Sequence, residues 1–486
     1  MRGTLFLRVE DSCRENQVGV RSVGVVCHCR RRGCMPKVTI EGRKWRVRRL
    51  ITWLSIATCI GGMFQACHSQ PTVTSNEASD EQFISDFERQ KRTQGIRDYF
   101  GERTKHRTII KTTRTRSGQI IDWIKPATQV DGGVLAMPPE VMSKQDAPAR
   151  PLNRYLEMDA GIKQSESQPN FELQLDEGTR GPAGTVPIVR FDVERYLESI
   201  KIPPKDPRDV LKKIPPPAPD SNQRYYAVWQ RFGTFYGTAG RINIWNTDGP
   251  VENETSIAQT AVIRGNPMQA IEAGKIEVQS LNGNRDPHFF TYFRTNGTAS
   301  GDWIAGYNTL VDGWIQYSPR VAPGMALNAW NSTQNGNQYS LDIEVRLHQG
   351  NWWVWVAGEW AGYYPYCIGG GAQPCSRGTL FSTSGIRDSA DRLDWYGEVY
   401  DSSAPSATST DMGSGQLAST GWQHAGYFRN LTYFWAPATY WWWDSGSVSV
   451  TDAACYDANG PFYSADASWR NWFFYGGPGK EATACR

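Results

Sequence analysis

Residues 339–356 read YSLDIEVRLHQGNWWVWV, and this stretch decides the fold. From Leu341 to Leu347 every second residue is apolar, which is the period of a β-strand with one buried face. HQGN at 348–351 then predicts a turn, and an aromatic run follows it. Short alternating stretches such as RINIW at 241–245 recur from residue 221 onward. We therefore predict an all-β fold, with an antiparallel β-sandwich over residues 222–486.

The composition of this C-terminal part excludes several classes of function. Residues 221–486 hold 17 of the 20 Trp, with 16 basic and 22 acidic side chains. A net negative charge argues against nucleic acid as a partner. The sequence contains no Gly-rich phosphate loop between a strand and a helix, no HExxH and no GxSxG. We therefore predict no cofactor and no metal, which leaves carboxylates as the catalytic groups.

The N-terminal segment has the pattern of an export signal. The basic stretch RKWRVRR at 43–49 precedes an uncharged run at 50–66. Residues 1–67 are predicted to hold a misassigned start, with Met35 as the true one, and then this signal. FQAC at 64–67 resembles a lipobox, so Cys67 is a candidate lipidation site. The protein is expected to be secreted, or to be an outer-membrane lipoprotein that contacts the membrane only through its lipid.

Between the signal and the sandwich, residues 68–200 resemble a propeptide. A weak helical period covers 71–100, and two alternating stretches at 107–115 and 120–124 flank a turn, which predicts a small β unit. Residues 126–220 are rich in Pro and charge and predict an extended, exposed stretch. It ends in a proline-rich linker at 201–221.

Four cysteines follow the signal segment, and their even number in an exported chain predicts disulfides. They are Cys367, Cys375, Cys455 and Cys485. Three pairings are open, and the local one, Cys367–Cys375 with Cys455–Cys485, is the most economical.

Two glutamates lie in segments of small and aromatic residues. Glu272 lies in PMQAIEAG at 267–274, and Glu398 lies in LDWYGEVY at 393–400. From the pattern alone, each glutamate fits an exposed position on a strand as well as a catalytic role. Two alternatives share these features, a β-sandwich glycoside hydrolase and a non-catalytic carbohydrate-binding module.

These segments resemble the neprosin-type glutamic peptidases, which are prolyl endopeptidases with an N-terminal activation domain. AIEAG at 270–274 and WYGEV at 395–399 are similar to the two catalytic-Glu segments of the family. Similar words occur in the same order: SGQIIDWI at 117–124, FTYF at 290–293, GYN at 306–308, NWW at 351–353, GYYP at 362–365, TDMGSG at 410–415, GYFRN at 426–430, CYD at 455–457 and FYGGPGK at 474–480. The resemblance covers about residues 105–135 and 222–486.

The resemblance implies an endopeptidase that cleaves polypeptides after proline at acidic pH. Glu272 and Glu398 would face each other across the concave side of the sandwich with a water between them. One would remove a proton from the water while its protonated partner stabilises the oxyanion. The candidates for stacking on a proline ring are Tyr292, Tyr307, Trp353 and Trp395.

The resemblance also implies a zymogen, in which the upstream β unit covers the cleft as an intramolecular inhibitor. Acid-triggered cleavage near Pro217 or Pro219 would release it. The chain departs from the family beside GYN at 306–308, where members often carry a cysteine pair. Cys367 and Cys375 lie instead in an insertion, whereas Cys455 and Cys485 match the C-terminal pair of the family.

Overall fold

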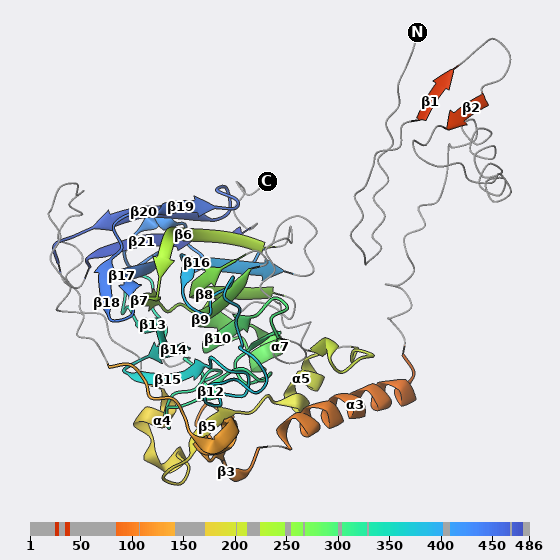
Figure 1. Ribbon diagram of the computed structural model, residues 1–486. Coiled ribbons are helices and arrows are strands. Elements are labelled where there is room, and N and C mark those ends of the chain that lie inside the picture. Colours follow the sequence, from red (N-terminus) through yellow and green to blue (C-terminus); the bar gives the residue numbers. More distant parts are fainter. Residues whose placement is uncertain are drawn as a thin grey trace. The chain divides into compact units, whose positions relative to one another are not determined.

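The computed structural model forms two compact units, Met1–Asp80 and Glu81–Arg486 (Figure 1). It describes residues 25–28, 35–38, 84–105, 107–140, 171–200, 202–210, 224–247, 254–265, 268–299, 304–327, 330–401, 409–466 and 469–479. In the first unit the described residues form one antiparallel hairpin, β1 (Val25–His28) with β2 (Met35–Val38). The predicted signal at 50–66 and Cys67 lie outside the described residues. Within the described ranges, no helix has both the length and the hydropathy needed to span a bilayer.

The second unit begins with a helix and a small sheet. Ser85 caps helix α3 (Asp86–Thr104) because its hydroxyl accepts a hydrogen bond from the backbone N–H of Glu88 at 3.2 Å. The sheet is antiparallel, with the order β3 (Ile109–Arg114), β4 (Ile120–Ile124) and β5 (Val186–Val189). The helix and the hairpin predicted before residue 125 are therefore confirmed.

The prediction of an extended, exposed stretch over residues 126–220 is wrong for much of its described part. Val186 and Ile188 of β5 are buried against Ile124, and Pro187 is tolerated because β5 is an edge strand. Val210, inside the predicted linker, is buried in a cluster with residues of α3. Burial of these apolar residues stabilises a folded conformation of the segment in spite of its high proline content. The other elements of this stretch are η2 (Pro126–Gln129), η3 (Asp131–Gly133), α4 (Glu172–Leu175), η5 (Glu177–Thr179) and α5 (Val193–Ser199).

Two antiparallel sheets make up the rest of the unit and confirm the predicted all-β sandwich. Among the described residues, one sheet has seven strands in the order β11 (Ala305–Tyr307), β10 (His288–Arg294), β9 (Gln269–Glu277), β8 (Glu254–Arg264), β16 (Ala390–Asp401), β6 (Arg224–Phe235) and β19 (Ser447–Val450). The other has nine: β12 (Ile315–Gln316), β15 (Glu359–Tyr364), β14 (Asn351–Val356), β13 (Ser340–His348), β7 (Gly237–Asn243), β17 (Gly426–Ala436), β21 (Asn471–Gly476) and β20 (Asp457–Tyr463), with β18 (Thr439–Trp442) paired to β17. Two short helices, α7 (Gln279–Asn282) and η7 (Ala418–Thr420), follow β9 and precede β17.

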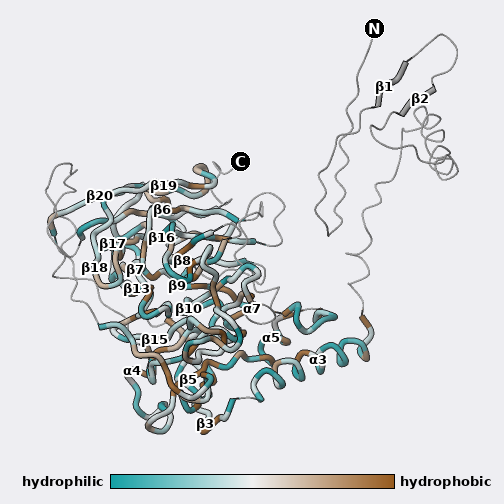
Figure 2. Tube along the Cα trace, in the orientation of Figure 1, coloured by the Kyte–Doolittle hydropathy of each residue, from teal (hydrophilic) through white to brown (hydrophobic). Residues whose placement is uncertain are grey.

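The hairpin predicted at 339–356 consists of β13 and β14, with Leu347 opposite Trp352. Gln349 and Gly350 form its turn with φ angles of 50° and 80°, a conformation that favours glycine. The apolar residues of β13 point into the core, as the alternation predicts. Figure 2 shows hydrophobic stretches on β8 and β9, both almost wholly buried, whereas α3 is largely hydrophilic.

An aromatic core lies between the two sheets. Trp229 of β6 packs edge-on against Phe473 at a centroid distance of 5.8 Å, and Trp395 of β16 packs in the same way against Phe428 at 5.9 Å. Opposite Trp395, residue 240 must be glycine, because a Cβ there would lie 2.9 Å from the indole ring. The inner face of the seven-stranded sheet is thus filled by packing, and its outer face is left for polar groups.

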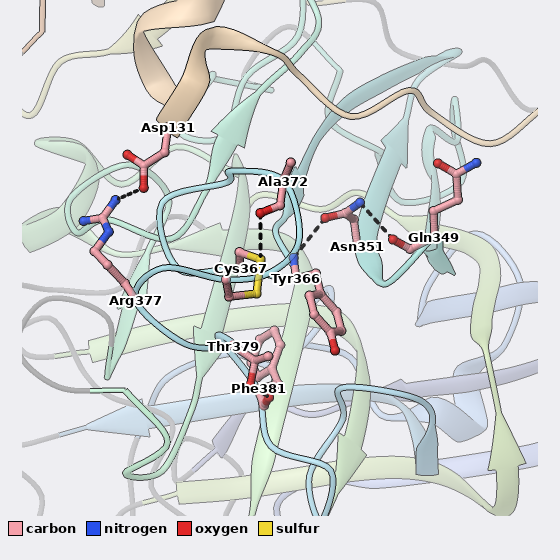
Figure 3. Close-up of a disulfide and its surroundings, with 10 residues drawn as sticks. Asp131, Gln349, Asn351, Tyr366, Cys367, Ala372, Arg377, Thr379 and Phe381 are labelled. Carbon is pink, nitrogen blue, oxygen red and sulfur yellow. Dashed lines mark hydrogen bonds and ion pairs between the residues drawn. A yellow bond between two sulfur atoms is a disulfide. The ribbon is translucent and has the colours of Figure 1, made fainter.

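The N-terminal region packs on the sandwich at segments near residues 316–326 and 369–377. Gln129 exchanges two hydrogen bonds of 2.9 Å with the backbone of Gln316, and Asp131 pairs with Arg377 at 2.7 Å. This ion pair lies beside the disulfide in the insertion (Figure 3). Trp123 shares a hydrophobic cluster with Val321.

The cysteine prediction is confirmed for one pair. Cys367 and Cys375 are joined by a disulfide with a Cα–Cα distance of 5.1 Å. Cys455 is also disulfide-bonded, and Cys485 lies outside the described residues. The pairing Cys455–Cys485 therefore stays a prediction.

Candidate active site

Glu272 and Glu398 lie on the same face of the seven-stranded sheet. Glu272 of β9 is paired with Ala261 of β8, which is in turn paired with Asp394 of β16. Residues paired across a ladder share a face, and so do residues two positions apart along a strand. Asp394, Tyr396 and Glu398 therefore face the same side as Glu272. Strand pairing brings together two carboxyl groups that are far apart in the sequence.

A pocket of about 320 Å³ opens on this face, and both glutamates lie in its wall. The described lining residues are Tyr226, Val228, Gln230, Ile263, Met268, Glu272, Arg392, Asp394, Tyr396, Glu398, Ser449, Val450 and Thr451. All of them belong to the sandwich, and no described residue of 84–210 is among them. The expectation that the upstream β unit covers the cleft stays a prediction.

The carboxylate of Glu398 is engaged at both oxygens. Oε1 forms an ion pair with the Arg224 guanidinium, and Oε2 accepts a hydrogen bond of 3.0 Å from Nε2 of Gln259. Glu398 is 1% exposed. Burial raises the pKa of Glu398, while the charge of Arg224 and the two hydrogen bonds oppose that rise. These contacts favour the ionised form of Glu398.

Glu272 has a different environment, although it is also buried. Burial raises its pKa to about 8, and the negative charge of Glu398 adds to this rise against the opposing charge of Arg224. Tyr292 lies directly opposite Glu272 in the ladder, and Ile263 and Met268 add apolar surface to the pocket wall. Glu272 is therefore protonated at neutral and acidic pH. The pKa values of both carboxyl groups are raised by burial, and Glu398 differs in that Arg224 and Gln259 contact its carboxylate.

Tyr292 and Tyr307, two of the four candidate substrate-binding residues, lie beside the carboxyl groups. Their rings are 4.8 Å apart between centroids. The charges of Glu272 and Glu398 both influence their pKa values, which burial above all raises. Tyr292 and Tyr307 are nevertheless buried, and neither is among the described lining residues of the pocket.

Trp353 and Trp395 lie elsewhere. Trp395 is fully buried on the inner face of β16, and its indole N–H donates to Oγ1 of Thr238 at 3.0 Å. Trp353 belongs to the nine-stranded sheet and packs against Tyr363 at a centroid distance of 4.5 Å. Both are core residues in the structure and do not line the pocket.

Several pocket residues were missed by sequence reasoning. Arg224 and Gln259 contact Glu398, and Tyr226 lies opposite it on β6. The signal for Tyr396 was present, because it lies two positions before Glu398 on a strand. Gln259 is a polar residue between apolar neighbours in ETSIAQTAVIR, which is a weaker signal. Within the described ranges, no group of three or more His, Cys, Asp or Glu side chains could hold a metal ion.

Comparison with known proteins gives a match to a family model and distant likenesses among solved structures. The family model for Neprosin matches residues 252–478. Scytalidoglutamic peptidase, in a crystal structure with a peptide-based transition-state analogue, aligns at 8% identity and a TM-score of 0.26, covering 51% of this chain and 96% of that one. The family match spans β8, β9 and β16, the strands that carry Glu272, Gln259 and Glu398. Residues 252–478 therefore match the neprosin family, which is the family that the sequence motifs resemble.

Proposed function

We propose that this protein is a glutamic endopeptidase in which Glu398 is the general base and Glu272 is the general acid. One observation carries the proposal: two buried carboxyl groups share one pocket, and the carboxylate of Glu398 is contacted by Arg224 and Gln259. Arg224 and Gln259 stabilise the carboxylate of Glu398, whereas burial keeps Glu272 protonated. Such a separation of pKa values is how paired carboxyl groups divide the roles of acid and base.

The reaction follows from these two protonation states. A water held between the carboxyl groups loses a proton to Glu398 as its oxygen bonds to the scissile carbonyl carbon. Glu272 donates a hydrogen bond to the oxyanion that forms. When the carbon–nitrogen bond breaks, the proton of Glu272 passes to the leaving nitrogen, which leaves Glu272 ionised and Glu398 protonated. Transfer of one proton between them restores the starting state.

The pH window follows from the same assignment. The base must be ionised, so activity rises as the pH passes the pKa of Glu398. The acid must be protonated, so activity falls as Glu272 ionises near its pKa of about 8. The resemblance to the family implies an acidic optimum. This optimum falls in the lower part of the pH range of activity, whose upper limit lies near pH 8.

We propose proline-containing polypeptides as substrates. Val228, Ile263 and Tyr396 form one apolar cluster, with Met268 packed against it, in the pocket wall beside Glu272. A compact apolar ring such as proline suits this surface. Trp353 and Trp395 have no part in this proposal.

We further propose that the protein is exported as a zymogen. The Cys367–Cys375 disulfide is typical of an oxidising compartment, either outside the cell or at an outer membrane if Cys67 is lipidated. The region before the linker would keep the enzyme inactive until the linker is cut, and the contacts of Gln129 and Asp131 would hold this region on the sandwich. Acid incubation followed by N-terminal sequencing tests this step, and an uncut, active full-length chain would refute it.

The central experiment measures cleavage of a proline-containing peptide by the acid-activated chain and by Glu398→Gln and Glu272→Gln, each treated with a trace of the activated parent. Each variant should lose at least about 1,000-fold in kcat/KM while keeping a cooperative thermal transition. Chelators and reagents for serine and cysteine should have no effect. Full activity in either variant, or hydrolysis of a polysaccharide panel in place of the peptide, would refute the proposal.

A further inference from the structure

Arg224 lies before the segment that matches the family, and yet it contacts the candidate base. It is the first residue of β6 and follows the predicted linker. Its side chain is 2% exposed, and its guanidinium forms the ion pair with Oε1 of Glu398. The guanidinium also stacks over the ring of Tyr400, 4.4 Å from its centroid. A planar cation is thus held between an aromatic face and a catalytic carboxylate.

A charge in this position requires an explanation. Moving an ion pair out of water costs several kcal/mol per ion, and hydrophobic residues of similar size often stabilise a fold better. Gln259 adds a second polar contact to the same carboxylate. Two buried side chains from different strands therefore converge on Glu398, although the core of the sandwich is already filled by aromatic packing.

We propose that Arg224 is a positioning residue for catalysis, one that keeps Glu398 ionised and fixes the orientation of its carboxylate. The inference rests on the proposed role of Glu398 as the base. Arg224 itself does not touch the scissile bond. Together with Gln259 it leaves the remaining lone pairs of the carboxylate to the attacking water.

The alternative is a purely structural ion pair, and the chain offers a matched control for it. Arg231 lies seven residues further along β6, forms an ion pair with Asp444 and stacks on Tyr433 at 4.0 Å. Its side chain is 16% exposed, and it is not among the pocket residues. Arg231 thus makes the same two kinds of contact as Arg224, an ion pair and a contact with an aromatic ring. Its carboxylate partner, Asp444, has no catalytic role in the proposal.

The test is the pH dependence of kcat/KM for peptide cleavage by the acid-activated chain. The acid limb of this profile is the rise of kcat/KM with pH as Glu398 ionises. A neighbouring cation lowers a carboxyl pKa by about 1–3 units, so Arg224→Gln should move the acid limb to higher pH by about one unit or more. This corresponds to a loss of about 10-fold on the acid side, with part of the activity recovered at higher pH. Arg224→Lys keeps the charge and should restore most of the limb. Arg231→Gln should lower Tm but leave the limb in place.

A second variant keeps the test decisive if Arg224→Gln does not fold. Tyr400→Leu removes the ring under the guanidinium but no charge, and it should move the same limb in the same direction by less. An acid limb that stays in place in the folded variants at 224 and 400, or that moves equally in Arg231→Gln, would overturn the inference. Failure of the proposed function is distinct, because it would show as retained cleavage by Glu398→Gln.

Discussion

Replacing Glu272 by Gln should stabilise the protein, and the gain should grow with pH. The folded carboxyl has a pKa of about 8 against an ordinary value of 4.5. Between these values the unfolded chain releases the proton and the folded one retains it, so stability falls as pH rises. At pH 7, about 2.5 units above 4.5, the buried carboxyl costs roughly 3 kcal/mol, since each unit corresponds to about 1.4 kcal/mol.

Thermal unfolding followed by tryptophan fluorescence measures this effect. Glu272→Gln should melt close to the parent at pH 4, where the carboxyl group of Glu272 is largely neutral in both the folded and the unfolded chain. At pH 8 the variant should melt several degrees above the parent. Glu277→Gln, on the same strand, is the control. Its carboxylate forms a buried ion pair with Lys275, so this variant leaves an unpaired charge and should melt lower at both pH values. Equal melting temperatures of Glu272→Gln and the parent at pH 8 would refute the claim that Glu272 is buried in its neutral form.

Further outcomes follow from local packing. Joint replacement of Cys367 and Cys375 by Ser opens a short loop and should cost about 2–3 kcal/mol in calorimetry, with kcat/KM unchanged because the loop lies outside the pocket wall. Gly274→Ala would place a Cβ 2.1 Å from the carbonyl oxygen of Ala258 and 2.7 Å from Cα of Gln259, so it should cost about 1–3 kcal/mol and reduce cleavage. Gly101→Ala in α3, where a Cβ meets nothing within 4 Å, should not destabilise the chain in the same melts. Trp395→Ala should cost about 3–5 kcal/mol.

The sandwich could be predicted because its strands carry local signals. β13 alternates and has one face in the core, so its period alone indicates a strand with a buried side. The prediction for residues 126–220 was wrong because a high proline content indicates an extended, exposed chain only where no other segment packs against it. In β5 the prolyl residue lies at a sheet edge, and the valines and isoleucine around it are mostly buried. That burial depends on β4, more than 60 residues earlier in the sequence.

The site could be predicted only where a single strand contains the information. Trp395 and Glu398 are three positions apart on β16, so their side chains point to opposite faces, and the period alone argues against Trp395 as a pocket residue. Tyr396 and Asp394 follow from the same period. The proximity of Tyr292 to Glu272 and of Arg224 to Glu398 depends instead on the register between strands. No local pattern in one sequence contains that register.

The position of Arg224 limits where processing can occur. It follows the linker and lies outside the family match at 252–478, so a protease domain defined by family similarity alone would omit it. β6 also pairs with β16 along the strand that carries Glu398. Cleavage near Pro217 or Pro219 would keep Arg224 in the active chain, whereas a cut after it would remove the cation and leave Glu398 buried without it. The active form is therefore expected to begin at or before residue 224, and mass spectrometry of the acid-activated chain would reveal an N-terminus that violates this limit.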